Sequence, residues 1–344
     1  MTTLATPSTT LSTPPSGAVA PPVAPEILTR AAGLVGPALA TAVDRLDPAL
    51  RVPVEHHLRG GGKRVRAALV LLSAAAVGAD EQVGVVGAVA IELVHNYSLV
   101  HDDIIDGDRE RRHQPTVWAE FGVGPAIVAG DALAALATQV LLEDPTPERV
   151  QAARRLAGAN QAMIAGQAAD MAYETRDQVT VAECLAMEQG KTGALLSCAA
   201  SLGAVLAGGP PASVHALSDY GDHLGIAFQA VDDLLGIWGD PAVTGKPVGA
   251  DLLAHKKALP VAAAMAVGGA VADELQRILG GDLTEADVAR ATTLIEDCGA
   301  RAEVTAIADT HLELALGALD RTPLQPSAKD ELLAVAHYVT ARDR

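Results

Sequence analysis

The stretch VGVVGAVAIELVHNYSLVHDDIID, residues 83–106, decides the fold class. Its apolar side chains fall on most faces of a helix rather than along one stripe, so we expect this helix to lie in the middle of a bundle. The helix ends in three carboxylates, Asp102, Asp103 and Asp106. Carboxylates rarely follow an apolar run unless something neutralises them, because desolvating an unpaired charge costs several kcal/mol. A bound divalent cation would neutralise them.

A second segment, residues 215–238, has the same apolar character and carries Asp232 and Asp233. The two sites differ, because Gly236 stands where the first site has Asp106. Two central helices that each carry carboxylates near their C-terminal ends indicate a bundle with a cavity between them.

The composition favours helices throughout. Of the 344 residues, 49% are hydrophobic but only 2% are aromatic, so alanine, leucine and valine must build the interior, which suits close-packed helices better than a sheet. Glycine and proline clusters divide the chain into successive helices, and we therefore predict an all-α fold. Residues 1–25 form a Thr, Ser, Pro and Ala tail that we expect to be disordered, and residues 26–344 form one domain. Such a tail is most often a mere extension, and a docking peptide for a protein partner or a compartment is the alternative.

The charge and the cysteines exclude several classes of partner. A formal net charge of -17 argues against a surface for nucleic acid or for an anionic membrane, since both need basic patches. Cys184, Cys198 and Cys298 are isolated, which fits a reducing compartment and no zinc site. The N-terminus lacks a signal-peptide pattern, so we expect a cytoplasmic protein. The uncharged run from Thr192 to Gly209 is diluted by small and polar residues and indicates a buried helix rather than a membrane span.

The spacing of the aspartates points to a metal. On a helix, Asp102 and Asp106 are four residues apart and share a face, whereas Asp103 points about 100° away. Oxygen ligands of this kind favour Mg²⁺, which keeps several waters and is completed by substrate phosphates. A solvated acidic helix end is the plain alternative, but the preceding apolar run weighs against it. Asp232 and Asp233 taken alone fit a helix-end acidic pair equally well. A His-Asp metal phosphohydrolase is disfavoured, because the histidines show no metal-ligand spacing.

Cationic residues accompany the acidic sites. The run GGKRVR, residues 61–66, places three cations behind glycines at a predicted helix start, where free backbone N–H groups also favour an anion. Other cations follow an acidic site or lie at a helix junction: Arg111, Arg112, Lys191, Lys246, Lys256 and Lys257. Each alone is more often a solvated surface charge, but together with the acids they predict a substrate that carries diphosphate. No nucleophilic dyad and no G-x-x-x-x-G-K-[ST] loop is present, which favours a diphosphate that leaves over a phosphate that is transferred.

The motifs, taken in order, resemble those of the trans-prenyl diphosphate synthases. The resemblance runs from about Leu28 to the C-terminus, and its motifs are weak singly but strong as an ordered set. They are GGKRVR (61–66), ELVH (92–95), HDDIID (101–106) with Arg111 and Arg112, Gly130-Asp131, Gly166-Gln167 with Asp170, KTG (191–193), FQAVDD (228–233), GKPVG (245–249) and KKALP (256–260).

This resemblance implies an isoprenoid synthase-type bundle of helices around a central cavity, in a homodimer. It implies three Mg²⁺ ions, with Asp102 and Asp106 binding two and Asp232 the third. The catalytic set that it implies comprises Asp102, Asp103, Asp106, Lys191, Asp232 and Asp233. The allylic diphosphate would contact Arg111, Lys191, Thr192, Gln229, Lys246 and Lys256. The diphosphate of isopentenyl diphosphate would contact Lys63, Arg66, His95 and Arg112.

The implied reaction is a condensation in three steps. The allylic diphosphate ionises, the double bond of isopentenyl diphosphate attacks the carbocation, and a proton is lost to the departing pyrophosphate. A carbocation requires an apolar cavity without water or nucleophiles, which the aliphatic composition fits.

Residues before Asp102 are expected to set the length of the product. Tyr97, an aromatic residue, lies five positions before Asp102, and the small Ser98 lies four before it. This pattern is most like the geranylgeranyl diphosphate (C20) type, and we expect Tyr97→Ala to lengthen the product. Gly236 departs from the family's usual aspartate, and we expect Gly236→Asp to leave activity similar or higher. A farnesyl diphosphate product and a non-catalytic subunit are the alternatives, while the second motif of a class I terpene cyclase is missing.

Overall fold

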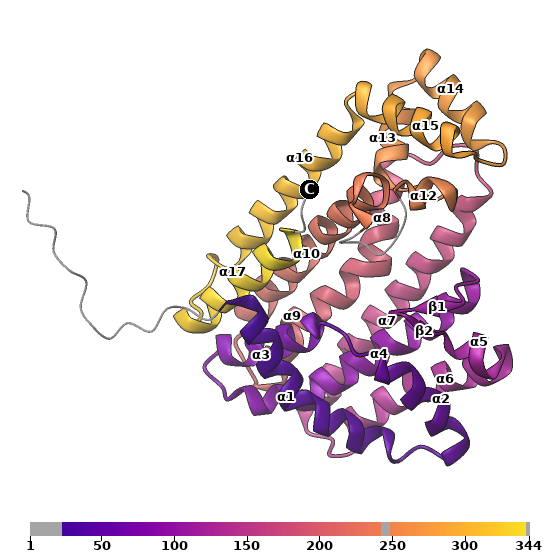
Figure 1. The fold of residues 1–344 in the computed structure, drawn as a ribbon. Coiled ribbons are helices and arrows are strands. Elements are labelled where there is room, and N and C mark those ends of the chain that lie inside the picture. Colours follow the sequence, from indigo (N-terminus) through magenta and orange to yellow (C-terminus); the bar gives the residue numbers. More distant parts are fainter. Residues whose placement is uncertain (1–22, 242–247, 342–344) are drawn as a thin grey trace, which may run out of the picture.

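The computed structural model describes residues 23–241 and 248–341, and it confirms the prediction of an all-α fold. Figure 1 shows helices packed side by side along most of the chain. The elements, in chain order, are α1 (Ala24–Val43), α2 (Pro48–Arg59), α3 (Val65–Ala76), η1 (Glu81–Gly84), α4 (Val85–Ile105), β1 (Glu110–Arg111), β2 (Gln114–Pro115), α5 (Val117–Phe121), α6 (Val123–Leu142), α7 (Pro147–Glu174), α8 (Val181–Glu188), η2 (Gln189–Gly193), α9 (Ala194–Leu206), α10 (Pro211–Trp238), α12 (Ala250–Leu253), α13 (Leu259–Val267), α14 (Gly269–Leu279), α15 (Glu285–Asp297), α16 (Ala300–Ala318) and α17 (Pro326–Thr340).

The two predicted central helices are α4 and α10. Helix α4 is buried on most of its faces and packs chiefly against α6 and α3. Helix α10 packs against α9 on one side and α16 on the other. Because helices surround both of them, their apolar residues are removed from water all the way round, as their sequences predict.

Two large clusters and one small one make up the core of the described residues, and α10 belongs to both large clusters. Its N-terminal half contributes Leu217, Tyr220 and Leu224 to the larger cluster, which also contains α1, α3, α4 and α9. Its C-terminal half contributes Val231 and Leu234 to the smaller cluster, formed with α8, α12, α13, α15 and α16. In Figure 1 helices α1, α3, α4 and α9 of the larger cluster lie in the lower part of the molecule, and α12, α13 and α15 of the smaller one lie in the upper part. The carboxylates at the end of α10 therefore lie where the two parts meet.

Three local features differ from the sequence-based expectations or add to them. Helix α1 begins at Ala24 with a proline at its first turn, so residues 24 and 25 belong to the helix and not to the predicted tail. The rest of that tail, up to residue 22, lies outside the described residues. A hairpin of two-residue strands, β1 and β2, follows the first aspartate site, and alternation of so few residues leaves no strand signal in the sequence. Cys184 and Cys198 are buried, as expected of core residues, while Cys298 is half-buried.

Among residues 23–241 and 248–341, two helical segments are long and apolar enough to cross a membrane, judged by length and composition alone. The first is residues 81–105, whose most apolar 18 residues are 72% buried. The second is residues 123–142, whose most apolar 18 residues are 44% buried. A core helix of a bundle passes the same test, and the burial of α4 among its neighbours accounts for the first segment. Helix α6 is covered less completely, and exposed apolar residues remain on it.

Candidate active site

The first aspartate site lies at the C-terminal end of α4. Asp102 is half-buried, and Asp106, which caps the helix, is exposed one turn later. Asp103 is buried on another face, where its Oδ1 accepts a hydrogen bond of 2.7 Å from Nε of Arg111 in the hairpin. Asp102 therefore remains partly exposed in the site, while its neighbour Asp103 binds the hairpin. The predicted catalytic role of Asp103 stays a prediction, and the structure gives it a positioning contact.

Burial makes Asp102 and Asp103 costly to ionise. It raises the pKa of Asp102 to about 6, an effect that nearby Lys191 opposes and Asp106 reinforces. It also raises the pKa of Asp103 to about 6, although the Arg111 guanidinium opposes this. The positive charges near the site therefore do not compensate its carboxylates fully, and a bound cation would stabilise their ionised forms.

The second aspartate site repeats this arrangement on α10. Asp232 is exposed and lines a cavity. Asp233 is buried, and both of its oxygens are engaged: Oδ1 accepts from Nε2 of Gln229 at 2.9 Å, and Oδ2 accepts from the backbone N–H of Leu259 at 2.8 Å. Asp233 thus ties α10 to the start of α13. Its catalytic role also stays a prediction.

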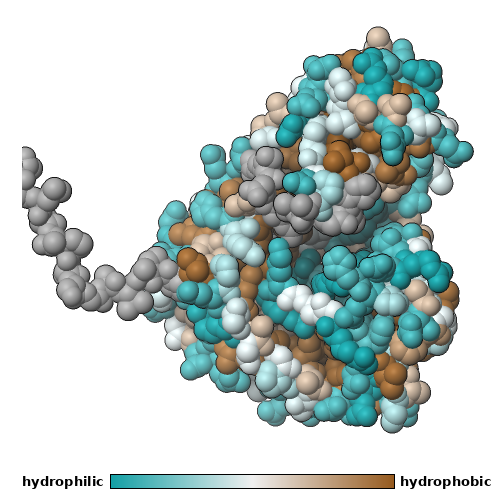
Figure 2. Space-filling view, viewed as in Figure 1, coloured by the Kyte–Doolittle hydropathy of each residue, from teal (hydrophilic) through white to brown (hydrophobic). Residues whose placement is uncertain are grey.

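A cavity of about 340 Å³ lies beside the second site and mixes acidic and basic side chains. Its charged and polar lining residues are Lys63, Asp170, Glu188, Lys191, Thr192, Gln229, Asp232, Asp233, Asp251, Lys256 and Lys257. We call it the acidic cavity. Figure 2, viewed as in Figure 1, shows a hollow between the upper and lower parts of the molecule, with hydrophilic residues beside it.

A π-helical turn, η2, carries Lys191 and Thr192 into this cavity. Such turns insert an extra residue into a helix and are frequent at functional sites. Nζ of Lys191 lies 2.6 Å from Oδ2 of Asp170 on α7, and Oγ1 of Thr192 donates to Oε1 of Gln229 at 3.1 Å. Helix α7 can approach the turn closely because it has a glycine there: a Cβ at Gly166 would lie 2.3 Å from the backbone nitrogen of Lys191. The site therefore depends on tight packing between α7 and η2.

A second cavity, of about 630 Å³, adjoins the first, and its lining is rich in basic residues. The predicted anion-binding residues Lys63, Arg66, His95 and Arg112 line it, together with Arg64 and Arg111. Apolar residues from three central helices form the rest of its wall: Leu99, Leu196, Leu224 and Phe228. We call it the basic cavity. Lys63 and Asp232 line both cavities, so the two adjoin.

The run GGKRVR does begin a helix, as predicted, but its cations differ in their surroundings. Arg64 has a left-handed backbone, with φ 56, and forms an ion pair with Glu92 on α4. Nη1 of Arg66 lies 3.4 Å from Nε2 of His95, and its buried Nε has no hydrogen-bond partner among the described residues. Burial lowers the pKa of His95 well below its usual value, and the neighbouring Arg66 adds to this. Lys63 and Arg66 are therefore the members of this run that are available to an anion.

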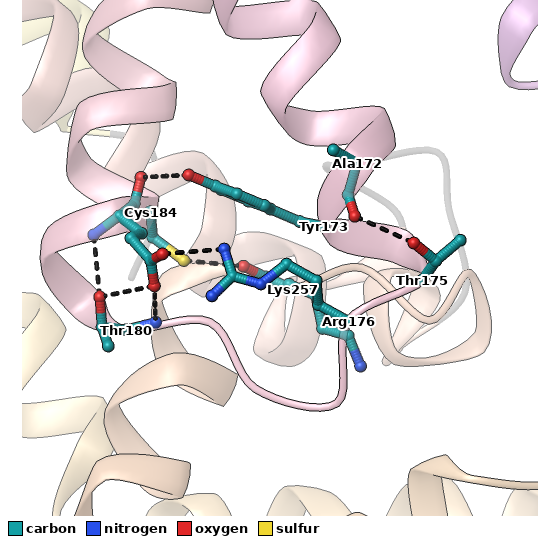
Figure 3. A network of polar contacts seen from close by, with 8 residues as sticks. Ala172, Tyr173, Thr175, Arg176, Thr180, Cys184 and Lys257 are labelled. Atoms are coloured by element: carbon teal, nitrogen blue, oxygen red, sulfur yellow. Dashed lines mark hydrogen bonds and ion pairs between the residues drawn. The ribbon is translucent and has the colours of Figure 1, made fainter.

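The loop that carries Lys256 is fixed by contacts behind the site. The thiol of Cys184 on α8 donates to the backbone oxygen of Lys257 at 3.0 Å (Figure 3). Next to Cys184 on α8, Oε1 of Glu183 accepts a hydrogen bond of 2.8 Å from Nη1 of Arg176. Burial lowers the pKa of Lys256, but nearby carboxylates outweigh burial and raise it above the usual value. These carboxylates belong to Asp251, Asp106, Asp170 and Asp233. Asp106 belongs to the first aspartate site and Asp233 to the second, so both sites act on the charge of the same lysine. Lys246, the remaining predicted contact of the allylic diphosphate, lies outside the described residues.

Tyr97 and Ser98 lie on a different face of α4 from the wall of the basic cavity, to which the helix contributes Glu92, His95, Asn96 and Leu99. The hydroxyl of Tyr97 donates to Oδ1 of Asn160 on α7, and its ring packs edge-on against His101. Oγ of Ser98 donates to the backbone oxygen of His95 at 2.9 Å. Tyr97 therefore bridges α4 and α7 at a point five residues before Asp102.

The sequence-based reasoning assigned no role to some residues of the site. Glu188, at the end of α8, is 2% exposed, and its carboxyl lies beside the buried carboxyl of Asp233. Burial raises its pKa well above the usual value, and the nearby Asp233 adds to this. Asp251 and Tyr338 also line the cavities, the latter beneath the ammonium of Lys63 at 5.5 Å from the ring centroid. A charged residue after an apolar run was a signal for Glu188, whereas local sequence gives none for Asp251.

The donor set fits Mg²⁺ held in part by a substrate. Its predicted ligands, Asp102, Asp106 and Asp232, offer carboxylate oxygens and no sulfur or imidazole, which is the choice of a hard cation. Among the described residues, no three or more side chains of the metal-binding types converge into a closed protein cage. Mg²⁺ usually takes one or two carboxylates and completes its shell with water and phosphate oxygens, so an open arrangement of this kind suits it.

Comparisons with known proteins agree with this geometry. A model of the polyprenyl synthetase family matches residues 47–295. The (2E,6E)-farnesyl diphosphate synthase of Mycobacterium tuberculosis is 45% identical over 325 residues, which cover 90% of each chain. The geranylgeranyl diphosphate synthase of the same organism is 40% identical over 342 residues, covering 95% of this chain and 96% of the relative. A solved structure of a polyprenyl synthetase from Streptomyces coelicolor aligns with a TM-score of 0.89 at 47% identity, over 92% of this chain and 99% of that one.

Proposed function

The chain belongs to the polyprenyl synthetase family, and from this premise we propose that it is a Mg²⁺-dependent geranylgeranyl diphosphate synthase. It is a polyprenyl diphosphate synthase, a prenyltransferase of isoprenoid biosynthesis, and its substrates are isopentenyl diphosphate and an allylic diphosphate. The metal and the product length belong to the proposal. A non-catalytic subunit is not favoured, because the relatives are enzymes and the chain keeps both aspartate sites.

One observation carries the proposal: two cavities of different charge adjoin at Lys63 and Asp232. The acidic cavity combines carboxylates with lysines, which suits a diphosphate bound together with Mg²⁺. The lining of the basic cavity includes arginines, a lysine and a histidine, which can hold a diphosphate directly. Two diphosphates bound side by side bring their hydrocarbon parts together, as a condensation requires.

The acidic cavity would hold the allylic diphosphate. Lys191 and Lys256 direct ammonium groups into it, and Thr192 adds a hydroxyl that Gln229 orients. Mg²⁺, when bound by Asp102, Asp106 and Asp232, supplies positive charge that stabilises the diphosphate as a leaving group. The lysines share this task, because the C–O bond breaks with both electrons going to the diphosphate. The buried contacts of Asp103 and Asp233 keep the carboxylates beside them in place.

The basic cavity would hold isopentenyl diphosphate by Lys63, Arg66, His95 and Arg112, the residues that the resemblance implies. Leu99, Leu196, Leu224 and Phe228 form an apolar wall that excludes water from the carbocation. The alkene electrons then form the new C–C bond. The proton lost in restoring the double bond passes to the departing pyrophosphate, whose oxygens lie at the same site.

The proposed C20 product rests on Tyr97. Its ring is 7% exposed and its hydroxyl is fixed on Asn160, so it is a rigid obstacle between α4 and α7. A growing chain that follows α4 away from Asp102 would meet this obstacle. Farnesyl diphosphate remains the alternative product, since the 45% identical relative carries that name.

We also propose a homodimer that pairs the exposed apolar face of α6. Val123, Ile127 and Val128 on this helix are 44–47% exposed. Val123 lies one turn before Ile127, and Val128 follows Ile127 directly. A second copy of the chain would remove this face from water. The cytoplasmic location expected from the sequence stays part of the proposal.

A product assay tests the proposed function. Purified protein would be supplied with Mg²⁺, labelled isopentenyl diphosphate and a C5, C10 or C15 allylic primer, and the products separated by chain length. The proposal predicts geranylgeranyl diphosphate as the main product from every primer that is accepted. Farnesyl diphosphate as the end product would replace the C20 assignment, and no condensation with any primer would refute the proposed activity.

A further inference from the structure

The two aspartate sites are unequal in sequence, and the structure shows what occupies the gap. The first site continues from Asp102 to Asp106, whereas the second continues from Asp232 to Gly236. Gly236 is four residues after Asp232 and therefore shares its face of α10. A Cβ at Gly236 would lie 1.9 Å from Oδ2 and 2.4 Å from Cγ of Asp251. The carboxylate of Asp251 thus fills the space into which a side chain at position 236 would project.

Asp251 is brought there by α12, a short helix that docks on the end of α10. The backbone N–H of Gly249 donates to the oxygen of Ile237 at 3.1 Å, and the side chain of Leu252 is fully buried in the upper core. Gly249 has a left-handed backbone, with φ 72, that a residue with a side chain would adopt only with strain. The docking of α12 is therefore specific, and it fixes the position of Asp251.

The surroundings of Asp251 are those of a functional carboxylate. It lines the acidic cavity together with Asp232 and Gly236, and its side chain is only 15% exposed. Nζ of Lys256, from the loop that follows α12, lies 3.9 Å from Oδ1 of Asp251. The buried carboxyl of Glu188 lines the same cavity, beside Asp233. The carboxyl groups of Asp232, Asp251 and Glu188 therefore line one cavity.

We propose that Asp251 supplies the third carboxylate of the second aspartate site and that Gly236 is the space that admits it. The carboxylate comes from a different element, α12, at the place where the first site uses its own helix. This inference rests on the proposed function, in which the site binds Mg²⁺ with a diphosphate. It reverses one sequence-based expectation, because Gly236→Asp would now push the new side chain against Asp251 and lower activity.

Binding of inorganic pyrophosphate, measured by calorimetry with and without Mg²⁺, tests the inference. Asp251→Asn removes the charge, and Gly236→Ala displaces the carboxylate while leaving it in the chain. Both variants are expected to weaken binding in the presence of Mg²⁺ by about tenfold or more, the usual effect of losing a carboxylate that supports a metal. Neither is expected to weaken binding without Mg²⁺. Gly236→Asp combined with Asp251→Ala should recover most of the affinity that Asp251→Ala alone loses.

Matched controls separate this effect from general damage. Gly33→Ala adds a methyl group where no atom lies within 4 Å, and Asp273→Asn removes an exposed carboxylate on α14; both should bind as wild type. Wild-type affinity in Asp251→Asn would overturn the inference, as would an equal loss with and without Mg²⁺, which would point to Lys256 instead. A wild-type protein that binds pyrophosphate no better with Mg²⁺ would refute the proposed function itself.

Discussion

Tyr97 is the residue that ties product length to the packing of the bundle. Because its hydroxyl is held by Asn160 on α7, the ring has little freedom to swing aside for a longer chain. Burial raises its pKa to about 12, so the hydroxyl stays a neutral hydrogen-bond donor over the whole working range.

We expect Tyr97→Ala to lengthen the product, because it removes the ring that stands between α4 and α7. The variant should also lose about 3 kcal/mol of folding free energy, the usual cost of truncating a buried aromatic residue. Tyr97→Phe is the matched control, since it keeps the ring and loses only the hydroxyl. The products are compared by chromatography, and an unchanged product length in Tyr97→Ala would remove Tyr97 from this role.

His57 on α2 makes the fold sensitive to acid. Burial lowers its pKa to about 4, and the nearby cations Arg111 and Arg112 add to this. Its Nε2 has no hydrogen-bond partner in the described portion of the chain. The unfolded chain, with an ordinary histidine, takes up a proton below about pH 6.5, while the folded protein does not until about pH 4.

Stability should therefore fall as the pH drops from about 6.5 to about 4, and His57 contributes about 3 kcal/mol of this loss. In His57→Gln, which cannot titrate, the free energy of unfolding should fall less over the same interval. Urea denaturation at several pH values measures the difference. Equal acid sensitivity in both proteins would show that His57 is not the group responsible.

At the scale of elements, the site depends on the contact between α7 and η2. The π-helical turn places Lys191 beside Asp170 and Thr192 beside Gln229, and Gly166 lets α7 come close enough to hold it. The atoms that a Cβ at Gly166 would meet belong to the backbone of Gly190 and Lys191, so no side-chain rotation can relieve the clash.

Gly166→Ala is accordingly expected to shift η2 and to slow catalysis by about tenfold or more, with about 2 kcal/mol of destabilisation from overpacking. Gly158→Ala, on the same helix but with nothing within 4 Å, is the control and should keep the wild-type rate. Initial rates and thermal unfolding midpoints are measured for both. A wild-type rate and midpoint in Gly166→Ala would contradict the close contact.

Much of the fold and part of the site were predictable from the sequence. The apolar runs before Asp102 and Asp232 identify two buried helices that end in carboxylates, and this requires only helical periodicity. The convergence of Asp106 and Lys256 depends on tertiary packing, and here it followed from the ordered motifs of the resemblance. Asp251 could not be placed, because nothing in the local sequence of α12 indicates that it fills the space beside Gly236. The helical period predicted that Asp102 and Asp103 point to different faces of the helix. It did not predict the hairpin whose Arg111 binds Asp103.

At the scale of the whole molecule, one hydrogen bond connects the proposed dimer surface on α6 with the first aspartate site on α4. His101, next to Asp102, places its Nε2 3.0 Å from the backbone oxygen of Ile127 on α6. Loss of a partner from α6 would expose the apolar face and loosen the helix that supports α4.

We expect Ile127→Glu to shift the protein from dimer to monomer and to lower its activity, since it buries a charge in the proposed interface. Val267→Glu, which alters an exposed valine on α13, should remain dimeric and active. Analytical ultracentrifugation gives the masses of both. A wild-type protein that sediments as a monomer would dismiss the dimer, and an Ile127→Glu protein that stays dimeric would move the interface elsewhere.

The central claim is that the two aspartate sites form one Mg²⁺-diphosphate site, and single-turnover release of pyrophosphate from a bound allylic substrate and isopentenyl diphosphate tests it most directly. Asp102→Asn on α4 and Asp232→Asn on α10 should each slow the Mg²⁺-dependent release by about a hundredfold or more, because each half supplies charge to the same leaving group. The double variant should be little slower than either single one, as expected of residues that act as a unit. Wild-type release in either single variant, or losses that simply multiply in the double variant, would contradict a single shared site.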